Sequence, residues 1–418
     1  MSARRDFRRG LTAAIAVATT ALLGLAACGS SSDNASEPPA IGATSAGGSE
    51  PSAAAIKIGT IGQYSGYAGA TSKATADSLQ AWASAVNAAG GIHGHPVQVI
   101  VKDDAANASK SLADVKDLVE NQHVVAIVGQ HESGLEATWE SYVDGKKIPV
   151  IGGPSVAPLW LTDPNFFPVS LTPVNSLTMS AYGAKLAGKT SIGITYCAEL
   201  PACKQVVPLL QQVAQNLGLQ FAGAPALSAS ATDYTSQCLA LKSKDAGAVI
   251  TATDSSTVVR FINACKQQGL NSLYINNPQN WSQDQLSNSA WDGVLFSSDA
   301  PLWFGDGTGT AEYLRAMKTY QPSSPLNSSG TGGWYAGKVF QTALDKAGIT
   351  DAPVTSTDVY KGLYALGPNF DLDGVLAPVT YTEGKPAVQQ TCGWFMKVVG
   401  DRETAPQGTK PVCLTGGQ

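Results

Sequence analysis

Few residues of this sequence are spaced for catalysis. The segment from Gly183 to Thr190, GAKLAGKT, matches the formal pattern of a phosphate-binding loop, in which glycines admit the phosphates and a lysine pairs with them. Such a loop must follow a strand and open a helix. Here a helical stretch precedes the glycines and the apolar run SIGITY follows them, so the order is reversed. We therefore reject nucleotide binding at this position.

Other catalytic arrangements have no better support. The sequence contains no GxSxG pattern for a serine nucleophile. His93 and His95 are spaced like metal ligands but lie in a turn between a predicted helix and a predicted strand. Asp103 and Asp104 could serve as acid and base, although they more simply end a strand and cap the next segment. We predict no metal, no cofactor and no enzymatic activity, with an exported enzyme as the alternative.

The cysteines indicate an oxidising compartment. Seven are present and no CxxC motif occurs, which favours structural disulfides over a metal site. Sequence spacing predicts three pairs, of which the first and third have the clearest support. The pairs are Cys197 with Cys203, Cys238 with Cys265, and Cys392 with Cys413.

The N-terminal segment has the layout of a secretory signal peptide. Arginines precede an apolar stretch from Leu11 to Leu25, which is short for a membrane-spanning helix. Residues 25–28, LAAC, resemble the lipobox of bacterial lipoproteins, which implies that Cys28 is acylated and becomes the mature N-terminus. We expect cleavage of residues 1–27, and a flexible lipid-anchored tether over the Ser-, Gly- and Ala-rich residues 28–55. The alternative is an uncleaved anchor with an incidental cysteine.

Composition sets the class of protein. A chain of 418 residues fits about two domains. Hydrophobic residues make up 44% and charged residues 14%, with 43 glycines and 23 prolines, as in a globular protein with many loops. The net charge of −5 offers no electrostatic footprint for nucleic acid.

The order of the elements predicts an α/β fold. From residue 56, short apolar runs alternate with amphipathic stretches, which indicates βαβ units and parallel sheets. A second series of the same kind begins near residue 176. Three helical stretches near 311–320, 333–347 and 357–366 follow, and strand-like runs at 374–381 and 393–399 end the chain. We predict one lobe from residues 56–175 plus 302–373 and a second from residues 176–301 plus 374–418.

Four segments, in chain order, resemble the type I periplasmic binding proteins, and most closely the leucine/isoleucine/valine-binding family. They are IKIGTIGQYSGYAGA, SAVNAAGGIHGHPVQVIVKDDAANASKS, VVAIVGQHESG and KIPVIGGPSVAPLWLTDPNFFPVSLTP. The family pattern NxxGGIxG stands at residues 87–94 and DGVL at residues 373–376, so the resemblance covers residues 56–400. It implies two Rossmann-like lobes joined by three crossovers, a small-molecule ligand in the cleft between them, and the permease subunits of an ABC transporter as partners.

The ligand is expected at the carboxyl ends of the strands, where open α/β sheets bind their ligands. The loops 63–69, 130–134 and 152–157 follow strands and are rich in Gly or Ser. The resemblance implies that Ser133 and the stretch 155–157 grip a ligand carboxylate, while Ser133 capping a helix is the alternative. Two tyrosines of the first loop either cover the ligand or pack at the lobe surface. The predicted contacts of the first lobe are Tyr64, Tyr67, Gln130, Glu132, Ser133, Ser155, Val156 and Ala157.

In the second lobe we predict contacts from Tyr196, Asp254, Ser255 and Gln279. Asp254 either pairs with a ligand cation or caps the helix that follows it. The resembled family often carries an acidic residue at the position of Gln279 to pair the α-ammonium of an amino acid. Because a buried ammonium without a counter-charge is costly, a standard amino acid requires Asp254 or Glu132 as the substitute.

Three tryptophans, Trp160, Trp281 and Trp303, either line an apolar cleft or belong to the core. We expect an extracytoplasmic solute-binding lipoprotein on the outer face of the cytoplasmic membrane. It would deliver an amino acid, an amide or a small carboxylate to an ABC importer. A lipoprotein that senses the same ligand for a signalling receptor is the alternative.

Overall fold

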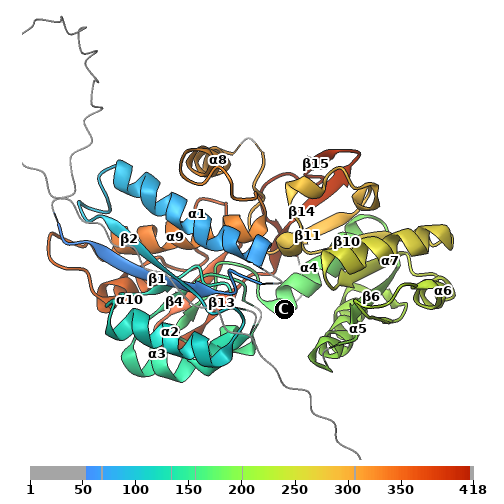
Figure 1. The fold of residues 1–418 in the computed structure, drawn as a ribbon, viewed down its shortest axis with the longest axis horizontal. Coiled ribbons are helices and arrows are strands. Elements are labelled where there is room, and N and C mark those ends of the chain that lie inside the picture. Colours follow the sequence, from blue (N-terminus) through green and yellow to red (C-terminus); the bar gives the residue numbers. More distant parts are fainter. Residues whose placement is uncertain are drawn as a thin grey trace, which may run out of the picture. The chain divides into compact units, whose positions relative to one another are not determined.

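Two β-sheets flanked by helices organise the chain (Figure 1). The computed structural model describes residues 53–66, 69–132, 134–155, 157–199, 201–305 and 307–414, all within one compact unit. The predicted signal peptide and Cys28 lie outside these residues. Within the described part of the chain, no helix combines the length and apolar character needed to span a bilayer.

The first sheet contains five parallel strands in the order β2-β1-β3-β4-β5. Helices α2 and α3 contribute to the core on one face and α1 to the core on the other, so the interior strand IKIGTIG is buried along nearly its whole length. The elements are β1 Ile56–Gly62, α1 Gly69–Ala88, β2 Val97–Asp103, α2 Ala108–Glu120, β3 Ile127–Val128, α3 Glu140–Lys146, β4 Val150–Ile151 and β5 Phe166–Phe167.

Three late helices pack against α1 or against one another. They are α8 Thr308–Tyr320, α9 Ser328–Ala347 and α10 Ser356–Ala365. In Figure 1 the orange α9 lies beside the blue α1, and the two helices are in close contact. The reason is local: a Cβ at Gly333 would lie 2.2 Å from the Thr75 carbonyl oxygen, and one at Gly337 would lie 2.4 Å from the Trp82 ring. Only glycine permits this helix spacing.

The second sheet is mixed. Its main path is β15-β14-β11-β10-β9-β6-β7, with β8 beside β6 and β16 beside β14. The strands from β6 to β11 are parallel, whereas β14 is antiparallel to β11. The strands are β6 Ser191–Cys197, β7 Gln220–Phe221, β8 Ala226–Leu227, β9 Ala248–Ala252, β10 Leu273–Asn276, β11 Leu295–Ser298, β14 Cys392–Val399, β15 Arg402–Thr404 and β16 Val412–Cys413. The helices are α4 Pro173–Leu186, α5 Val206–Leu217, α6 Thr235–Lys242 and α7 Ser255–Gln267.

The chain passes between the two sheets three times, after β5, after β11 and after α10. The first two crossovers are joined directly, because the Leu171 amide donates to the Asp299 carbonyl oxygen over 3.0 Å. The third includes the hairpin of β12 Val379–Thr382 and β13 Lys385–Gln389, which contacts β5 and α10. The predicted strand at 374–381 is thus one arm of a separate two-stranded sheet.

Short 3-10 helices continue several strand ends. After β3 the chain forms η1 Leu135–Thr138, which is followed by α3. Two others matter for the site, η2 Pro158–Leu161 after β4 and η4 Pro278–Asn280 after β10. All eight tryptophans are buried, so Trp160, Trp281 and Trp303 belong to the core rather than to an exposed cleft wall.

Candidate ligand-binding site

The first predicted loop places Tyr64 inward. The residue is buried, its hydroxyl forms a hydrogen bond with Thr60 Oγ1 over 2.9 Å, and its amide donates to Asp103 Oδ1 over 3.0 Å. Burial raises the pKa of the Tyr64 phenol far above its ordinary value, so the group stays neutral. Tyr67 lies outside the described residues.

The loop after β3 turns its predicted ligand side chains into the first lobe. Gln130 and Glu132 are fully buried, and both are held by hydrogen bonds. Glu132 Oε1 accepts from Ser111 Oγ over 2.6 Å and from Trp139 Nε1 over 3.4 Å, while its Oε2 has no partner among the described residues. Burial, reinforced by Asp104, raises the pKa of Glu132 to about 9. Glu132 therefore carries a proton at neutral pH.

Gln130 ties the loops after β3 and β4 together. Its Nε2 donates to Pro154 O and to Glu136 Oε1, both over 3.3 Å, and its Oε1 accepts from the Glu132 amide. Glu136, also fully buried, accepts in addition from Trp160 Nε1 over 3.2 Å. Burial raises the pKa of Glu136 to about 7. The loops after β3 and β4 are thus fixed to one another through a neutral or weakly acidic network.

The loop after β4 is packed against this network. Gly153 has a φ of 112°, and a Cβ there would lie 2.2 Å from Gln130 O, so only glycine fits. Ser155 is buried and its hydroxyl approaches Gly153 O at 3.5 Å, while Ala157 is buried at the start of η2. Ser133 and Val156 lie outside the described residues, so their predicted grip on a carboxylate remains a prediction.

In the second lobe the predicted residues share one edge of the sheet. Tyr196 is the penultimate residue of β6, Asp254 follows β9 and Gln279 follows β10, and these three strands are neighbours. Asp254 is the N-cap of α7, with Oδ1 accepting from the Thr257 amide over 2.9 Å. Ser255, the first residue of α7, is part-buried beside it. Of the two roles predicted for Asp254, the structure shows the capping role.

Sequence reasoning missed Asp299, which directly follows β11. Its Oδ1 accepts from Asn277 Nδ2 over 2.6 Å and its Oδ2 from Gln279 Nε2 over 2.8 Å. Asp299 is only 6% exposed, and burial raises its pKa to about 6. A carboxylate directly after the buried strand LFSS was the signal available in the sequence. Its two partners stand 20 and 22 positions earlier, and only the folded sheet brings them together.

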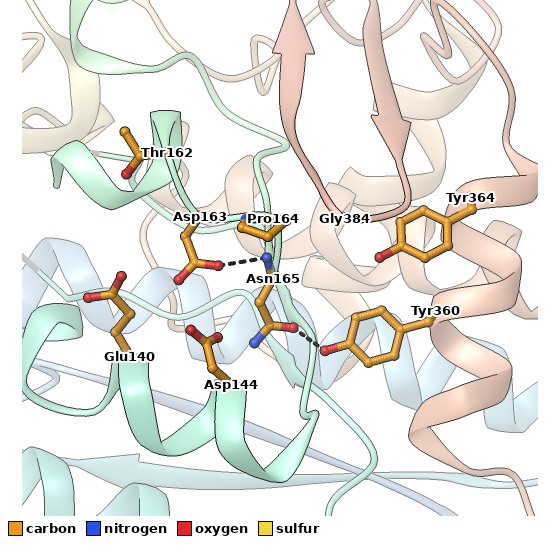
Figure 2. A pocket seen from close by; sticks show the side chains of 9 residues that line it. All are labelled: Glu140, Asp144, Thr162, Asp163, Pro164, Asn165, Tyr360, Tyr364 and Gly384. Atoms are coloured by element: carbon orange, nitrogen blue, oxygen red, sulfur yellow. Dashed lines mark hydrogen bonds between the residues drawn. The ribbon is translucent and has the colours of Figure 1, made fainter.

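A cavity of 480 Å³ is lined by none of the predicted ligand residues (Figure 2). Glu140, Asp144 and Asp163 line one side, and their carboxylate oxygens lie within 4.8 Å of one another. Tyr360 and Tyr364 line the other side with stacked rings. Burial and the nearby Asp163 raise the pKa of Asp144 to about 6. This proximity of like charges was not predicted from the sequence.

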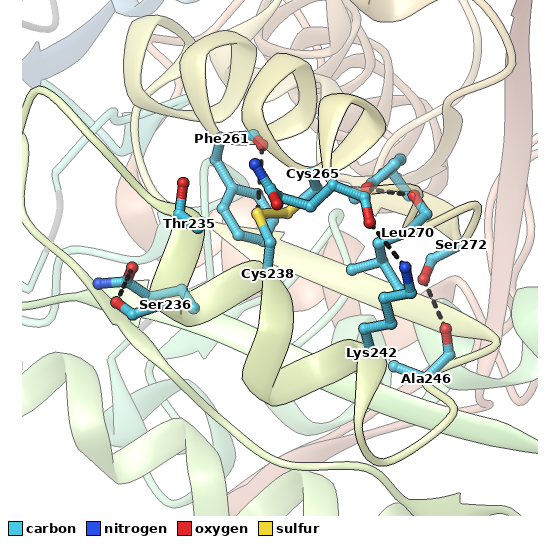
Figure 3. The surroundings of a disulfide bond; sticks show 12 residues. Thr235, Ser236, Cys238, Lys242, Ala246, Phe261, Cys265, Leu270 and Ser272 are labelled. Atoms are coloured by element: carbon cyan, nitrogen blue, oxygen red, sulfur yellow. Dashed lines mark hydrogen bonds between the residues drawn. A yellow bond between two sulfur atoms is a disulfide. The ribbon is translucent and has the colours of Figure 1, made fainter.

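The structure contains the three disulfides that the spacing predicts, and all of them involve the second lobe. Cys197 pairs with Cys203, Cys238 with Cys265, and Cys392 with Cys413. The second joins α6 to α7 and is fully buried beside Phe261 (Figure 3). The first begins at the residue after Tyr196, so it braces the end of β6 at the candidate site.

Comparison with known proteins decides the family. A family model described as periplasmic binding protein matches residues 55–403. The chain belongs to the periplasmic binding protein family. Its members are substrate-binding proteins rather than enzymes, and membership implies an extracytoplasmic location.

Solved structures of family members share the fold. A branched-chain amino acid ABC transporter protein from Thermus thermophilus with bound valine is 14% identical with a TM-score of 0.73, over 86% of this chain and 97% of that one. A branched-chain amino acid substrate-binding protein from Streptococcus pneumoniae in complex with isoleucine is 16% identical with a TM-score of 0.68, over 86% and 100%. A solute-binding protein from R. palustris in complex with benzoate is 14% identical with a TM-score of 0.65, over 86% and 98%.

Proposed function

We propose that this protein is the solute-binding component of an ABC importer and captures a small polar molecule in the cleft between its two lobes. The observation that carries this proposal is the family match across residues 55–403. In both sheets, the predicted ligand loops follow the carboxyl ends of parallel strands. We assign residues 56–175 plus 302–373 to the first lobe and residues 176–301 plus 374–418 to the second.

The ligand class follows from the site and from the neighbours. Structural relatives were solved with valine, isoleucine and benzoate, all of which carry a carboxylate. Gln130 holds the loops after β3 and β4 together, which supports our proposal that backbone groups of these loops bind such a carboxylate. We therefore propose an amino acid, an amide or a small carboxylate as the ligand.

A thermal-shift screen tests this function. Amino acids, amides, ureas and small aromatic acids are added to the mature protein with its disulfides intact. A ligand that binds only the native state raises stability by RT ln(1 + [L]/Kd), so a concentration of about 100 times Kd contributes about 2.7 kcal/mol. We expect at least one class to raise the Tm, with calorimetry confirming one site. If no compound in the screen raises the Tm or gives a calorimetric signal, the proposed function fails.

The proposed location has its own test. Lipidation of Cys28 would tether the body outside the membrane through residues 28–55, which are rich in small polar residues. Palmitate labelling in a producing bacterium should mark the wild type and fail for Cys28→Ser, which should be released from membranes. Labelling of both proteins to the same extent would contradict acylation at this residue.

A further inference from the structure

Two carboxyl groups meet at the carboxyl edge of the first sheet. Asp104 directly follows β2 and Glu132 lies in the loop after β3, and these two strands flank β1. Both side chains are fully buried, and they are in hydrogen-bonding contact with each other. The main chain fixes this approach. The Asp104 amide donates to Gly62 O over 3.1 Å, and the amide of His131 donates to Ile61 O over 2.8 Å.

Each of these carboxyl groups has one oxygen with a donor and one without. Asp104 Oδ1 accepts from the Ala106 amide over 2.7 Å. Glu132 Oε1 accepts from Ser111 Oγ on α2 over 2.6 Å. Asp104 Oδ2 and Glu132 Oε2 are buried and have no hydrogen-bond partner within the described part of the chain. A buried oxygen without a donor is costly, and two of them on groups in contact indicate one hydrogen atom that serves both.

No cation compensates the pair. Among the ion pairs of the described residues, none includes Asp104 or Glu132. Lys110 and Asp114 of α2 pair with each other over 2.5 Å, and burial lowers the pKa of His131 to about 4, so its ring is neutral. The other titratable groups beside the pair are Tyr64, Asp103 and Glu136. Because two anions in contact cannot both stay ionised in a buried site, one of the two carboxyl groups is protonated.

We propose that Asp104 and Glu132 share one proton, and that this hydrogen bond positions the predicted ligand loop after β3. The inference rests on the proposed solute-binding function and adds two positioning residues to it. Glu132 carries the proton and the Asp104 carboxylate accepts the bond, because the Ala106 amide already supports a negative charge on Asp104. Burial, followed by the contact with Asp104, raises the pKa of Glu132 to about 9, so the proton stays in place at neutral pH.

The shared proton completes a set of ties between the loops of the first sheet. Gln130 joins the loop after β3 to the loop after β4. Glu132 joins the same loop to α2 through Ser111 and to the loop after β2 through Asp104. Loss of the proton would leave two anions in one buried site, and their repulsion would move the loop after β3 away from α2.

Infrared spectroscopy locates the proton in the mature protein with ¹³C-labelled glutamate carboxyl groups. At pH 8 the wild type should show a carboxylic acid band, since Glu136, with its pKa of about 7, is then mostly ionised. Glu132→Gln should remove the band, and Glu383→Gln, at an exposed position, should keep it. Asp104→Asn should lower the midpoint of the pH titration of the band by about 1–3 units. The reason is that the asparagine amide donates in place of the proton and removes the neighbouring charge.

Amide hydrogen exchange at pH 8 tests the positioning role. The amides of Gly129, His131 and Glu132 are all hydrogen-bonded in the loop after β3. In Glu132→Gln they should exchange as slowly as in the wild type, because the new NH₂ group donates to Asp104. In Glu132→Ala they should exchange about tenfold faster or more, because the tie to α2 and to Asp104 is lost.

Three results would overturn the proposal. They are a wild type without the acid band at pH 8, a band whose midpoint Asp104→Asn does not move, and equal exchange in Glu132→Gln and Glu132→Ala. The infrared result stands even if Glu132→Ala fails to fold. Neither measurement needs a solute, so their failure removes the shared proton alone, whereas failure of the solute screen removes the proposed function.

Discussion

The buried carboxyl group of Glu136 makes the stability of the first lobe depend on pH. Its pKa is about 7 in the folded protein, against an ordinary value of 4.5. The folded state therefore keeps a proton that the unfolded chain has already lost between these two values. By linkage, stability falls as pH rises through this window, and the group adds no further slope above about pH 7.

The substitution Glu136→Gln removes this dependence. The amide keeps an oxygen for Gln130 Nε2 and Trp160 Nε1, and its NH₂ group takes the place of Oε2, which has no partner among the described residues. At about 1.36 kcal/mol for each pKa unit, the difference between 4.5 and 7 corresponds to about 3 kcal/mol. We expect the variant to match the wild type near pH 4.5 and to be more stable by up to about 3 kcal/mol at pH 8.

Urea unfolding at pH 5, 6, 7 and 8, with the disulfides intact, measures this difference. Glu383→Gln, at an exposed position in the β12–β13 turn, serves as the control and should differ from the wild type by a constant amount. A difference between Glu136→Gln and the wild type that does not grow with pH would refute the account of the network. A variant that becomes progressively less stable than the wild type as the pH rises from 5 to 8 would show instead that Glu136 is needed as an anion.

Three further predictions concern a helix–helix contact, a disulfide and a helix cap. Gly333→Ala should destabilise the protein by about 1–3 kcal/mol or more, because its Cβ meets the Thr75 carbonyl at 2.2 Å; an unchanged urea midpoint would disprove the close contact. Replacing Cys238 and Cys265 together by Ser should cost about 3–4 kcal/mol for a loop of 27 residues, seen as a lower Tm. Asp254→Ala should cost about 1 kcal/mol through loss of the α7 cap, and a neutral result in urea would contradict that role.

The sequence predicted the architecture because its signals are periodic. The first strand is mostly apolar, and the three late helices show apolar faces that need a surface to cover. The disulfides also followed from spacing. The antiparallel attachment of β14 was beyond reach, because strand direction depends on a crossover with no local signature.

The site was less predictable, because orientation at the end of a strand depends on tertiary contacts. Gln130 and Glu132 are two positions apart and turn into one side of the loop, while His131 between them forms a hydrogen bond with Thr75 on α1. The sequence indicates that successive side chains of this loop alternate in direction. It does not indicate which of them point into the lobe. Asp299 was not predicted because its contacts are with Asn277 and Gln279. These residues approach it only across neighbouring strands.

The return of α9 to α1 has a consequence for biogenesis. The first sheet cannot be covered until residues near 347 have been translocated, and the second sheet awaits β14, which ends at Val399. Neither half can finish folding while most of the polypeptide is still crossing the membrane. A chain with this connectivity stays incompletely folded until almost its last segment has passed through the export channel. A secreted fragment that ends near residue 300 would lack structural elements of both halves.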